Sequence, residues 1–367
     1  MDITIERREL VRLASLCARV APRKPQEPRM GAALLEASGG RLRLSATDQL
    51  SAIRVSAEAA VSSEGACGVP AHRLAEIASM APDGPIGLRL TGKRLEVQAG
   101  RARTSVPVWA SEEAPWAPEA VDPCLTARAP VEALAALLTA AAALPVADVD
   151  RWGLNGVQFE RCGEALCVRG TDGHRLAHTG MIAEAIEGDT PSDVLGSVDS
   201  LSLMARALTG CHGDATLTIG RASLSVEAGG VWLWSRAVEG EAPNARAIVP
   251  TDHTVEITCQ PAELAEAVRR AMRVRESVDL CVGGALEVVA MSPIGEHRET
   301  VPADLACKHA TKMRIRGAYL IDALAPLAGL AVIRQAGALS PVTVTAGSAP
   351  SLDGAEYTAI VMPMRPD

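Results

Sequence analysis

The sequence is poor in aromatic residues and in lysine. Aromatic side chains make up 2% of the 367 residues, with one phenylalanine, two tyrosines and five tryptophans. Lysine stands only at positions 24, 93, 308 and 312, so arginine supplies almost all the positive charge of a chain whose net charge is −8. This skew, together with the abundance of alanine, indicates a GC-rich genome as much as any function. A hydrophobic content of 48% suits a globular protein, and the length predicts two or three domains.

The sequence also lacks the usual signals of membrane insertion, export and metal binding. It has no 20-residue apolar run, and it opens on the alternating stretch MDITIERREL, so we expect neither a membrane span nor a signal peptide. The nine cysteines are scattered without a CxxC pair, and Cys162 and Cys167 fall on a predicted hairpin rather than in a zinc knuckle. We expect reduced thiols in a cytoplasmic protein that holds no metal.

Motifs of the common enzyme classes are missing as well. No Walker loop, GxSxG elbow or HExxH sequence occurs. Asp172, His174 and His178 could serve as acid–base groups or metal ligands. However, the pattern around them is strand-like, and residues four apart on a strand lie too far along the chain to share an ion easily. We favour a non-catalytic protein without a cofactor, with an enzyme that uses Asp172 and His174 as the alternative.

An internal repeat organises the chain. Strands that run into amphipathic helices begin at Ile3, Leu125 and Val255, and each is followed by a glycine turn and an alternating strand. Each copy then shows a second helix and another strand pair; these second helices start at Ala71, Ser197 and Gly317, the last of them predicted through residue 330. The pattern predicts an α+β fold of three repeated domains, each with two helices on antiparallel sheet. We place the domains at residues 1–121, 122–250 and 251–367.

The middle copy contains the most distinctive stretch, residues 151–176. Apolar residues at period two on either side of Gly163 predict a hairpin. The following run TDGHRL gathers a hydroxyl, a carboxylate, an imidazole and a guanidinium beside Gly173. These groups are either acid–base groups and metal ligands, or one wall of a binding groove.

Three motifs carry a resemblance to a known family: Leu154-Asn155-Gly156, the run from Thr171 to Leu176, and Val361-Met362-Pro363-Met364-Arg365. The chain resembles the bacterial DNA polymerase III beta subunit, or sliding clamp, over its whole length. The resemblance implies the DNA-clamp fold and a homodimer closed head to tail as a ring around double-stranded DNA. It also implies a non-catalytic processivity factor that tethers the polymerase alpha subunit, the clamp loader and other proteins by their peptide tails.

The same resemblance implies three sets of functional residues. The peptide pocket, between the second and third domains, would be formed by Leu154, Thr171, Gly173, His174, Arg175, Leu176, Pro243, Ile248, Tyr319, Ile360, Val361, Met362, Pro363 and Met364. The contacts to DNA would come from Arg23, Lys24, Arg73 and Trp152. The dimer interface would include Thr104, Val106, Met272 and Arg273.

Arginines on the first helices of the repeats would add to a basic lining. Arg8, Arg12 and Arg19 share one face of the first helix, and residues 269, 270 and 273 of the third copy are also arginines. The lining need only be mildly basic, because phosphate attraction is screened beyond roughly 8–10 Å at physiological salt.

Several positions depart from the family pattern. Ala242-Pro243-Asn244-Ala245 stands where an aromatic–Pro–Asp–Tyr run is usual, and Ala247 and Arg275 replace further residues near the pocket. Thr104 and Arg273 stand at the expected subunit contact in place of apolar residues. We therefore expect weak binding of standard peptides and a weak dimer. A specialised second clamp with altered partners, for repair, lesion bypass or inhibitor resistance, is the alternative function.

Overall fold

The computed structural model describes residues 1–115, 121–148, 153–191, 193–293, 295–307, 309–347 and 349–365. Within these ranges the chain forms six α-helices and 28 strands, and the strands pair antiparallel. The predicted α+β class is confirmed. None of the helices in these residues is both long and apolar enough to cross a bilayer.

The order of elements repeats three times. Each copy begins with a strand that runs into a helix, continues through five strands to a second helix, and ends in three strands. The first copy contains β1 (Asp2–Glu6), α1 (Arg7–Val20), β2 (Ala32–Ser38), β3 (Arg41–Thr47), β4 (Ser51–Glu58), β5 (Ala60–Ser63), β6 (Gly65–Pro70), α2 (Ala71–Met80), β7 (Pro85–Thr91), β8 (Arg94–Ala99) and β9 (Ala102–Pro107). The second contains β10 (Leu125–Pro130), α3 (Val131–Ala142), β11 (Val157–Cys162), β12 (Ala165–Thr171), β13 (Arg175–Ile182), β14 (Ala185–Gly188), β15 (Val194–Gly196), α4 (Val198–Ala207), β16 (Asp214–Ile219), β17 (Ser223–Ala228) and β18 (Val231–Arg236), and is followed by the short β19 (Val238–Glu239). The third contains β20 (Val255–Cys259), α5 (Pro261–Ala271), β21 (Ser277–Val282), β22 (Leu286–Ser292), β23 (Gly295–Val301), β24 (Ala303–Cys307), β25 (Thr311–Arg316), α6 (Gly317–Leu324), β26 (Ala331–Gln335), β27 (Val342–Thr345) and β28 (Thr358–Val361).

Local sequence explains where several elements begin and end. Gly163 has a φ of 64°, which lets the hairpin between β11 and β12 reverse where the sequence predicts it. Pro261 opens α5 at a position whose N–H has no partner within the helix. The prediction of a helix from Gly317 through residue 330 is wrong at its end: α6 stops at Leu324, because Pro326 cannot continue a helix and disfavours the helical conformation just before it.

The chain divides into two compact units. The first comprises Met1–Ala136 with Ser202–Ala237, and the second comprises Leu137–Leu201 with Val238–Asp367, so α3 and α4 are each cut by the division. The boundaries at residues 121 and 250 are not tested by this division and stay predictions.

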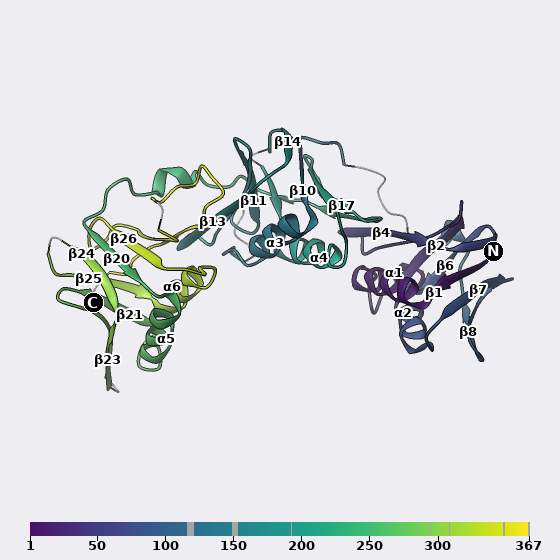
Figure 1. Cartoon of the computed structure of the whole chain (residues 1–367), viewed down its shortest axis with the longest axis horizontal. Helices are drawn as coiled ribbons and strands as arrows, with labels where there is room; N and C mark the ends of the chain where they lie inside the picture. The colour runs from purple at the N-terminus through teal and green to yellow at the C-terminus, as the bar shows by residue number, and fades with distance from the viewer. Residues whose placement is uncertain are drawn as a thin grey trace. The chain divides into compact units, whose positions relative to one another are not determined.

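The first unit contains two sheets. One has the strand order β5-β1-β7-β8-β9; in the other, the strands of this unit run β10-β16-β17-β18-β4-β3-β2-β6. Helix α1 packs against α2 and across β3 and β4 (Figure 1). Leu42, Leu44, Ile53 and Val55 alternate along β3 and β4 and are fully buried, which leaves the intervening side chains on the other face of the sheet.

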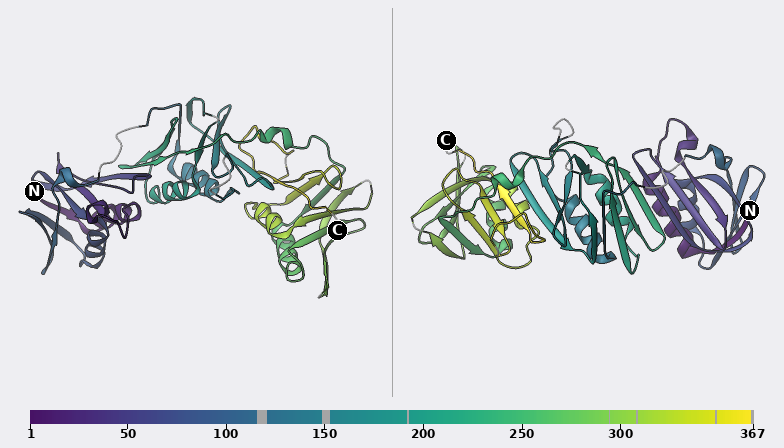
Figure 2. Two further views of the ribbon diagram at one scale, coloured as in Figure 1. Left: turned by 180° about the vertical axis from the view of Figure 1, so that it is seen from behind. Right: turned by 90° about the horizontal axis from the view of Figure 1, so that it is seen from above.

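The second unit joins strands of the second and third repeats. Its larger sheet runs β19-β15-β11-β12-β13-β28-β27-β26-β20-β24, and a smaller one runs β23-β22-β21-β25. Helix α5 packs against α6 and against β22 and β23, and α6 packs against β25 and β28 (Figure 2). Because β13 pairs with β28, the segment after β12 and the last strand of the chain become neighbours.

Candidate functional site

The junction of β13 and β28 brings together two of the three motifs noted in the sequence. Arg175 pairs with Val361 and Leu176 with Ile360. Beyond the last pair, the Met362 N–H donates a hydrogen bond of 3.0 Å to the His174 carbonyl. The chain end is held further by the Met364 N–H, which donates to the Arg314 carbonyl at 2.8 Å.

The run from Thr171 to Arg175 is a tight turn held by its own side chains. The Asp172 carboxylate accepts the N–H groups of His174 (2.9 Å) and Arg175 (3.0 Å). The Thr171 hydroxyl donates to the Arg175 carbonyl at 2.7 Å and accepts the Gly173 N–H at 3.1 Å. Gly173 has a φ of 88°, a conformation that favours glycine. The carboxylate is thus engaged in shaping the turn, which argues against the acid–base interpretation of Asp172.

The two histidines of this region lie in different surroundings. His174 is exposed in the turn, whereas His178 on β13 is fully buried and its Nε2 lies 2.7 Å from the Gly354 carbonyl oxygen. Burial first, and then the positive charges of Arg169 and Arg246, hold the pKa of His178 below its usual value. This placement does not bring the two rings together as metal ligands.

A stack of charged and aromatic side chains stands beside the turn. The Arg175 guanidinium carbon lies 4.4 Å from the centroid of the Tyr319 ring of α6, and the His174 ring stacks on that ring with centroids 6.5 Å apart and planes inclined by 19°. Arg175 is fixed by ion pairs with Asp172 (3.0 Å) and with Asp322 of α6. These contacts leave a half-buried aromatic ring flanked by a cation and an imidazole.

The apolar residues expected in the pocket divide into buried and exposed groups. Leu176, Ile360 and Val361 are at most 2% exposed; Leu176 and Ile360 pack with Ala245 and Leu352, and Val249 packs against this cluster. The prediction that they line an open slot is therefore corrected, because both faces of β28 are covered. Leu176 and Ile360 form a buried floor, whereas Val361, the next residue along the strand, is buried on the opposite face. Ile248, Met362 and Met364 are 42%, 41% and 42% exposed.

The remaining pocket residues have varied exposure. Pro243 is exposed, Pro363 and Leu154 are half-buried, and the Leu154 carbonyl accepts the Ala147 N–H at 2.7 Å. We call the exposed His174, Met362 and Met364, together with the half-buried Arg175 and Tyr319, the β13–β28 surface.

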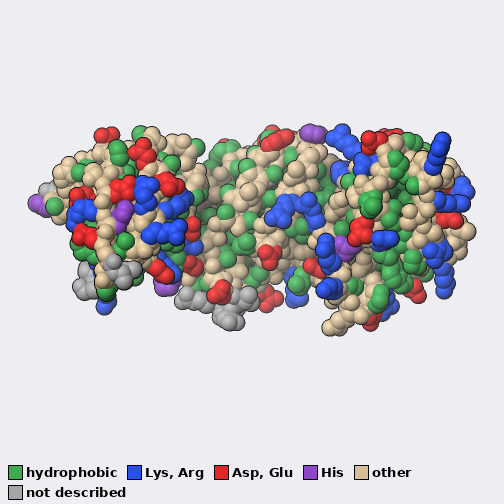
Figure 3. Space-filling view, turned by 90° about the horizontal axis from the view of Figure 1, so that it is seen from below, with side chains coloured by type: hydrophobic (Ala, Val, Ile, Leu, Met, Phe, Trp, Pro, Cys, Tyr) green, Lys and Arg blue, Asp and Glu red, His purple; other side chains and the backbone are tan. Residues whose placement is uncertain are grey.

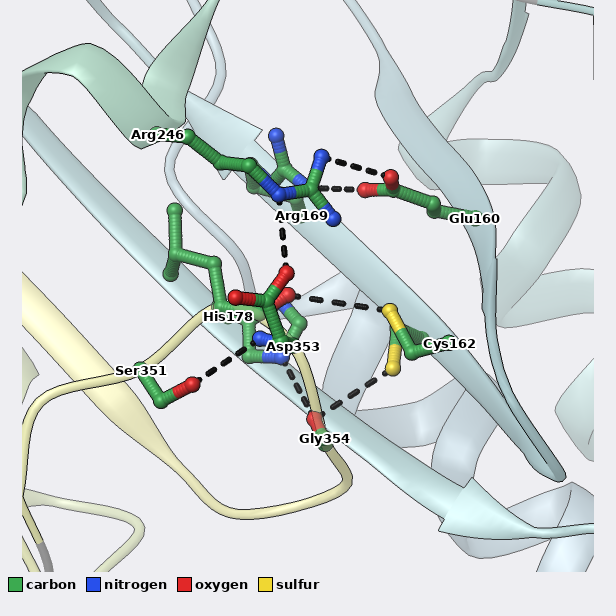
Figure 4. Close-up of polar contacts among 10 residues, drawn as sticks. Glu160, Cys162, Arg169, His178, Arg246, Ser351, Asp353 and Gly354 are labelled. Carbon is green, nitrogen blue, oxygen red and sulfur yellow. Dashed lines mark hydrogen bonds and ion pairs between the residues drawn. The ribbon is translucent and has the colours of Figure 1, made fainter.

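A network that the sequence did not reveal anchors the loop before β28 (Figure 4). Arg246 forms ion pairs with Glu160 of β11 (2.7 Å) and Asp353 (2.8 Å), and Glu160 also pairs with Arg169. These ion pairs hold the pKa of Arg246 above its ordinary value. Two thiols also lie at this loop: Cys162 Sγ, labelled in Figure 4, is 3.6 Å from the Leu352 carbonyl oxygen. Cys167 Sγ is 3.3 Å from the Gly354 carbonyl oxygen. No sequence spacing signals these contacts, because their members come from three separate segments.

Three of the residues expected at DNA gather on the first unit. Arg23 and Lys24 are exposed in the loop after α1, and Arg73 is exposed on α2, where it pairs with Glu76 at 3.1 Å. His72 Nε2 lies 3.0 Å from the Ala21 carbonyl oxygen, which ties the start of α2 to the end of α1. Trp152 lies outside the described residues.

The arginines on the helices are less available than the sequence predicts. Arg12 pairs with Glu9 (2.9 Å) and donates to the Ser56 carbonyl, while Arg269 pairs with Glu266 at 2.5 Å. Arg270 pairs with Glu299 at 2.6 Å. Figure 3 shows this mixing of blue and red side chains on the face seen from below. These ion pairs leave less free positive charge on α1 and α5 than the sequence predicts.

The residues expected at the dimer interface lie on β9 and directly after α5. β9 ends its sheet with only β8 beside it among the described residues; Thr104 is half-buried there and Val106 is 4% exposed. The Val106 side chain is buried against its own unit, so it is not available for contact with a partner. At the end of α5, Arg273 is exposed and Met272 is half-buried; its Sδ lies 2.6 Å from where a Cβ on Gly317 would stand.

Comparisons with known proteins point to one family. The family model described as the N-terminal domain of the DNA polymerase III beta subunit matches residues 1–118, and the model of its central domain matches residues 131–244. The beta sliding clamps of Caulobacter vibrioides and Escherichia coli K12 are each 28% identical to this chain, with both chains covered in full. The Streptomyces coelicolor beta sliding clamp is 29% identical over 75% of this chain and 74% of its own length.

Solved structures agree with this result. The Caulobacter crescentus pol III beta structure superposes with a TM-score of 0.87 at 28% identity and full coverage of both chains. A Pseudomonas aeruginosa sliding clamp bound to griselimycin gives 0.88 at 24% identity, covering 100% of this chain and 99% of the other, which shows the shared fold. The two family models together match most of the chain, and it belongs to the DNA polymerase III beta subunit family, the beta sliding clamps.

Proposed function

We propose that this beta sliding clamp closes head to tail with a second copy into a ring around duplex DNA and tethers the replicative polymerase. The observation that carries the proposal is the β13–β28 surface, where the turn from Thr171 to Arg175 meets the chain end through the Met362–His174 hydrogen bond. Both motifs are those that the family resemblance assigns to partner binding. We assign the protein a non-catalytic role in the cytoplasm. All nine cysteines are free, as expected in a reducing compartment.

The β13–β28 surface suits a short peptide tail with apolar anchors. Met362 and Met364 offer exposed, flexible side chains that can repack around different partners. The Tyr319 ring, held between Arg175 and His174, adds a flat wall with polar edges. Ala245 packs on the Leu176 floor; Pro243 precedes it and Ile248 follows it in the chain. We assign Pro243, Ile248 and Leu154 to the rim of the site. We assign the alpha subunit of the polymerase and the clamp loader as occupants.

The ring would hold DNA by topology rather than by tight contact. Arg23, Lys24 and Arg73 would meet the phosphates without reading sequence, and Trp152 would lie near them. Closure requires a contact between unlike surfaces, one from the first repeat and one from the third. The open edge of β9 can pair with an edge strand through its backbone, and β23, which packs on α5 near Arg273, is such an edge.

The relatives that match over the full length are named beta sliding clamps, which favours the replicative role over a specialised second clamp. The direct assay is DNA synthesis on primed circular DNA with the cognate polymerase and clamp loader. We expect products thousands of nucleotides long only when clamp, loader and ATP are all present. Synthesis that is equally processive without this protein would refute the tethering role.

A matched pair of variants locates the tethering surface. Met362→Ala with Met364→Ala should shorten the products, whereas Met291→Ala, which changes a methionine 48% exposed on β22, should not. Equal products from both variants would place the partner site elsewhere on the clamp.

A further inference from the structure

A polar hollow lies on the first unit, on the sheet face opposite α1. Strands β3, β4, β18, β17 and β16 run side by side there, and their alternate residues are buried towards the other face. The hollow measures about 460 Å³. Its lining includes Arg43, Arg54, Trp232, Glu227 and Thr216, and we call these five residues the Trp232 face.

Strand register sets these side chains in a row. Arg54 pairs with Trp232, Trp232 pairs with Glu227, and Glu227 pairs with Thr216 on successive strands. Arg43 pairs with Ser56 on β4, so it stands one step along from Arg54 on the same face. The row therefore presents two guanidiniums, an indole, a carboxylate and a hydroxyl in that order.

The charged side chains in this row form no close ion pairs, although Glu36 on β2 stands opposite Arg43 in the strand register. The Arg54 guanidinium carbon lies 4.9 Å from the centroid of the Trp232 ring, and Arg43 is exposed. Among the described residues neither arginine forms an ion pair with a carboxylate, and neither does Glu227. Two neighbouring arginines donate hydrogen bonds to Ser56: Arg41 to its hydroxyl and Arg12 to its carbonyl. Two free guanidiniums side by side are suited to bind one carboxylate.

The aromatic content of this face is high for this protein. The chain has five tryptophans, and both Trp232 and Trp234 stand half-buried at alternate positions of β18, on the same side of the sheet. Trp and Arg are the residues that most often dominate the binding energy of protein interfaces. A sheet face with both residue types and a hollow between them has the composition of a docking surface.

We propose that the Trp232 face docks an extended peptide segment of a partner protein that carries an acidic side chain next to an apolar one. The carboxylate binds Arg43 and Arg54, the apolar side chain packs on Trp232, and an N–H or ammonium group of the segment meets Glu227. Single-stranded nucleic acid fits less well, because a continuous phosphate chain along the row would run onto the Glu227 carboxylate. The proposal does not depend on the assignment of the β13–β28 surface, which uses other residues.

The test is selection of displayed random hexapeptides on the full-length protein, followed by titration of the enriched peptides as labelled synthetic probes. We expect enrichment of sequences with aspartate or glutamate beside a large apolar residue. Arg54→Gln and Arg43→Gln should each weaken probe binding about tenfold, as should the probe with its acid changed to the amide. Arg101→Gln, at an exposed turn of the same unit, and Arg175→Gln, on the β13–β28 surface, should leave the affinity within about twofold.

Three outcomes would overturn the proposal. The first is selection without any such peptide, and the second is equal binding of the probe to Arg54→Gln. The third is a loss of oligothymidylate binding in Arg54→Gln with no change in peptide binding, which would assign the face to nucleic acid. Far-ultraviolet circular dichroism of each variant shows whether it folds; Arg43→Gln changes an exposed side chain and remains the deciding variant if Arg54→Gln is unstable.

Discussion

The Met362 N–H donates to the His174 carbonyl at 3.0 Å, so the end of the chain continues the pairing of β28 with β13 past its last residue. This bond places exposed Met362 beside the turn whose His174 and Arg175 side chains contact the Tyr319 ring. The position of these side chains therefore depends on the fold of the third repeat as well as on the second. Partner binding should respond to changes in either.

The first prediction concerns the methionines. Met362→Ala with Met364→Ala should weaken binding of a labelled peptide with leucine and phenylalanine anchors by at least about tenfold, because burying one methionine contributes about 1.5–3 kcal/mol. Met291→Ala should bind as the wild type does. Removing residues 362–367 should abolish binding while the first unit still unfolds cooperatively in urea. Undiminished binding to that truncation would show that the peptide site lies elsewhere.

The second prediction concerns DNA. Replacing Arg23, Lys24 and Arg73 by alanine should weaken association with duplex DNA equally for all sequences. Since each lost phosphate contact lowers the slope of log affinity against log salt by about 0.9, the slope should fall by up to about 3. A control with the same composition replaces Lys93, Arg101 and Arg221, all exposed in turns between strands. If both triple variants keep the wild-type slope, the basic contacts have been misplaced.

The third prediction concerns the dimer. Thr104 and Arg273 leave less apolar surface than a phenylalanine-sized contact would, a loss on the order of 2 kcal/mol. We expect the dimer to dissociate at a higher concentration than a clamp with apolar residues at these two positions. Thr104→Leu should lower the dimer dissociation constant several-fold in sedimentation equilibrium. Ser63→Leu, on β5 at the opposite edge of the same sheet, serves as the control. A wild-type dimer that survives nanomolar dilution, or a chain that stays monomeric at tens of micromolar, would contradict this expectation.

The fourth prediction concerns acid stability. Burial holds the pKa of His178 below its value of about 6.5 in the unfolded chain. Below that pH the unfolded chain therefore binds a proton at this histidine that the folded chain does not bind. The free energy of unfolding should therefore fall as pH decreases through this window, by at most about 1.4 kcal/mol per pH unit from this group.

His178→Gln tests this cause, because a neutral amide can still donate to the Gly354 carbonyl. Urea unfolding at pH 7.5, 6.5 and 5.5 should show a flatter pH dependence in His178→Gln than in the wild type. His212→Gln, at an exposed turn, should not flatten it. Parallel profiles for His178→Gln and the wild type would show that this histidine is not the cause.

The sequence was sufficient to predict the fold but not the side-chain pairing. Period-two alternation around Gly163 and the threefold order of strands and helices are local signals, and the structure has both. The arginines of α1 and α5 form a basic face in sequence, yet Arg12 and Arg270 are paired with carboxylates. Such pairs depend on neighbours that only the folded chain supplies.

The candidate surface shows the same limit. The motifs around His174 and Met362 lie together in the fold, but strand alternation alone did not tell which faces of β13 and β28 remain open. Leu176 and Val361 proved to be buried, as did Val106 in the first repeat. Asp353 and Glu160, which anchor Arg246, carry no pattern that a single sequence could reveal.

The ring is the central claim, and its most direct test is retention on DNA of different topology. The labelled clamp is loaded by the cognate loader onto a nicked circular plasmid and separated by gel filtration before and after the plasmid is cut once. An encircling clamp stays with the circle and is lost from the linear DNA as it slides off the ends. A clamp that remains equally bound to both forms is held by direct contact, and the ring would be contradicted.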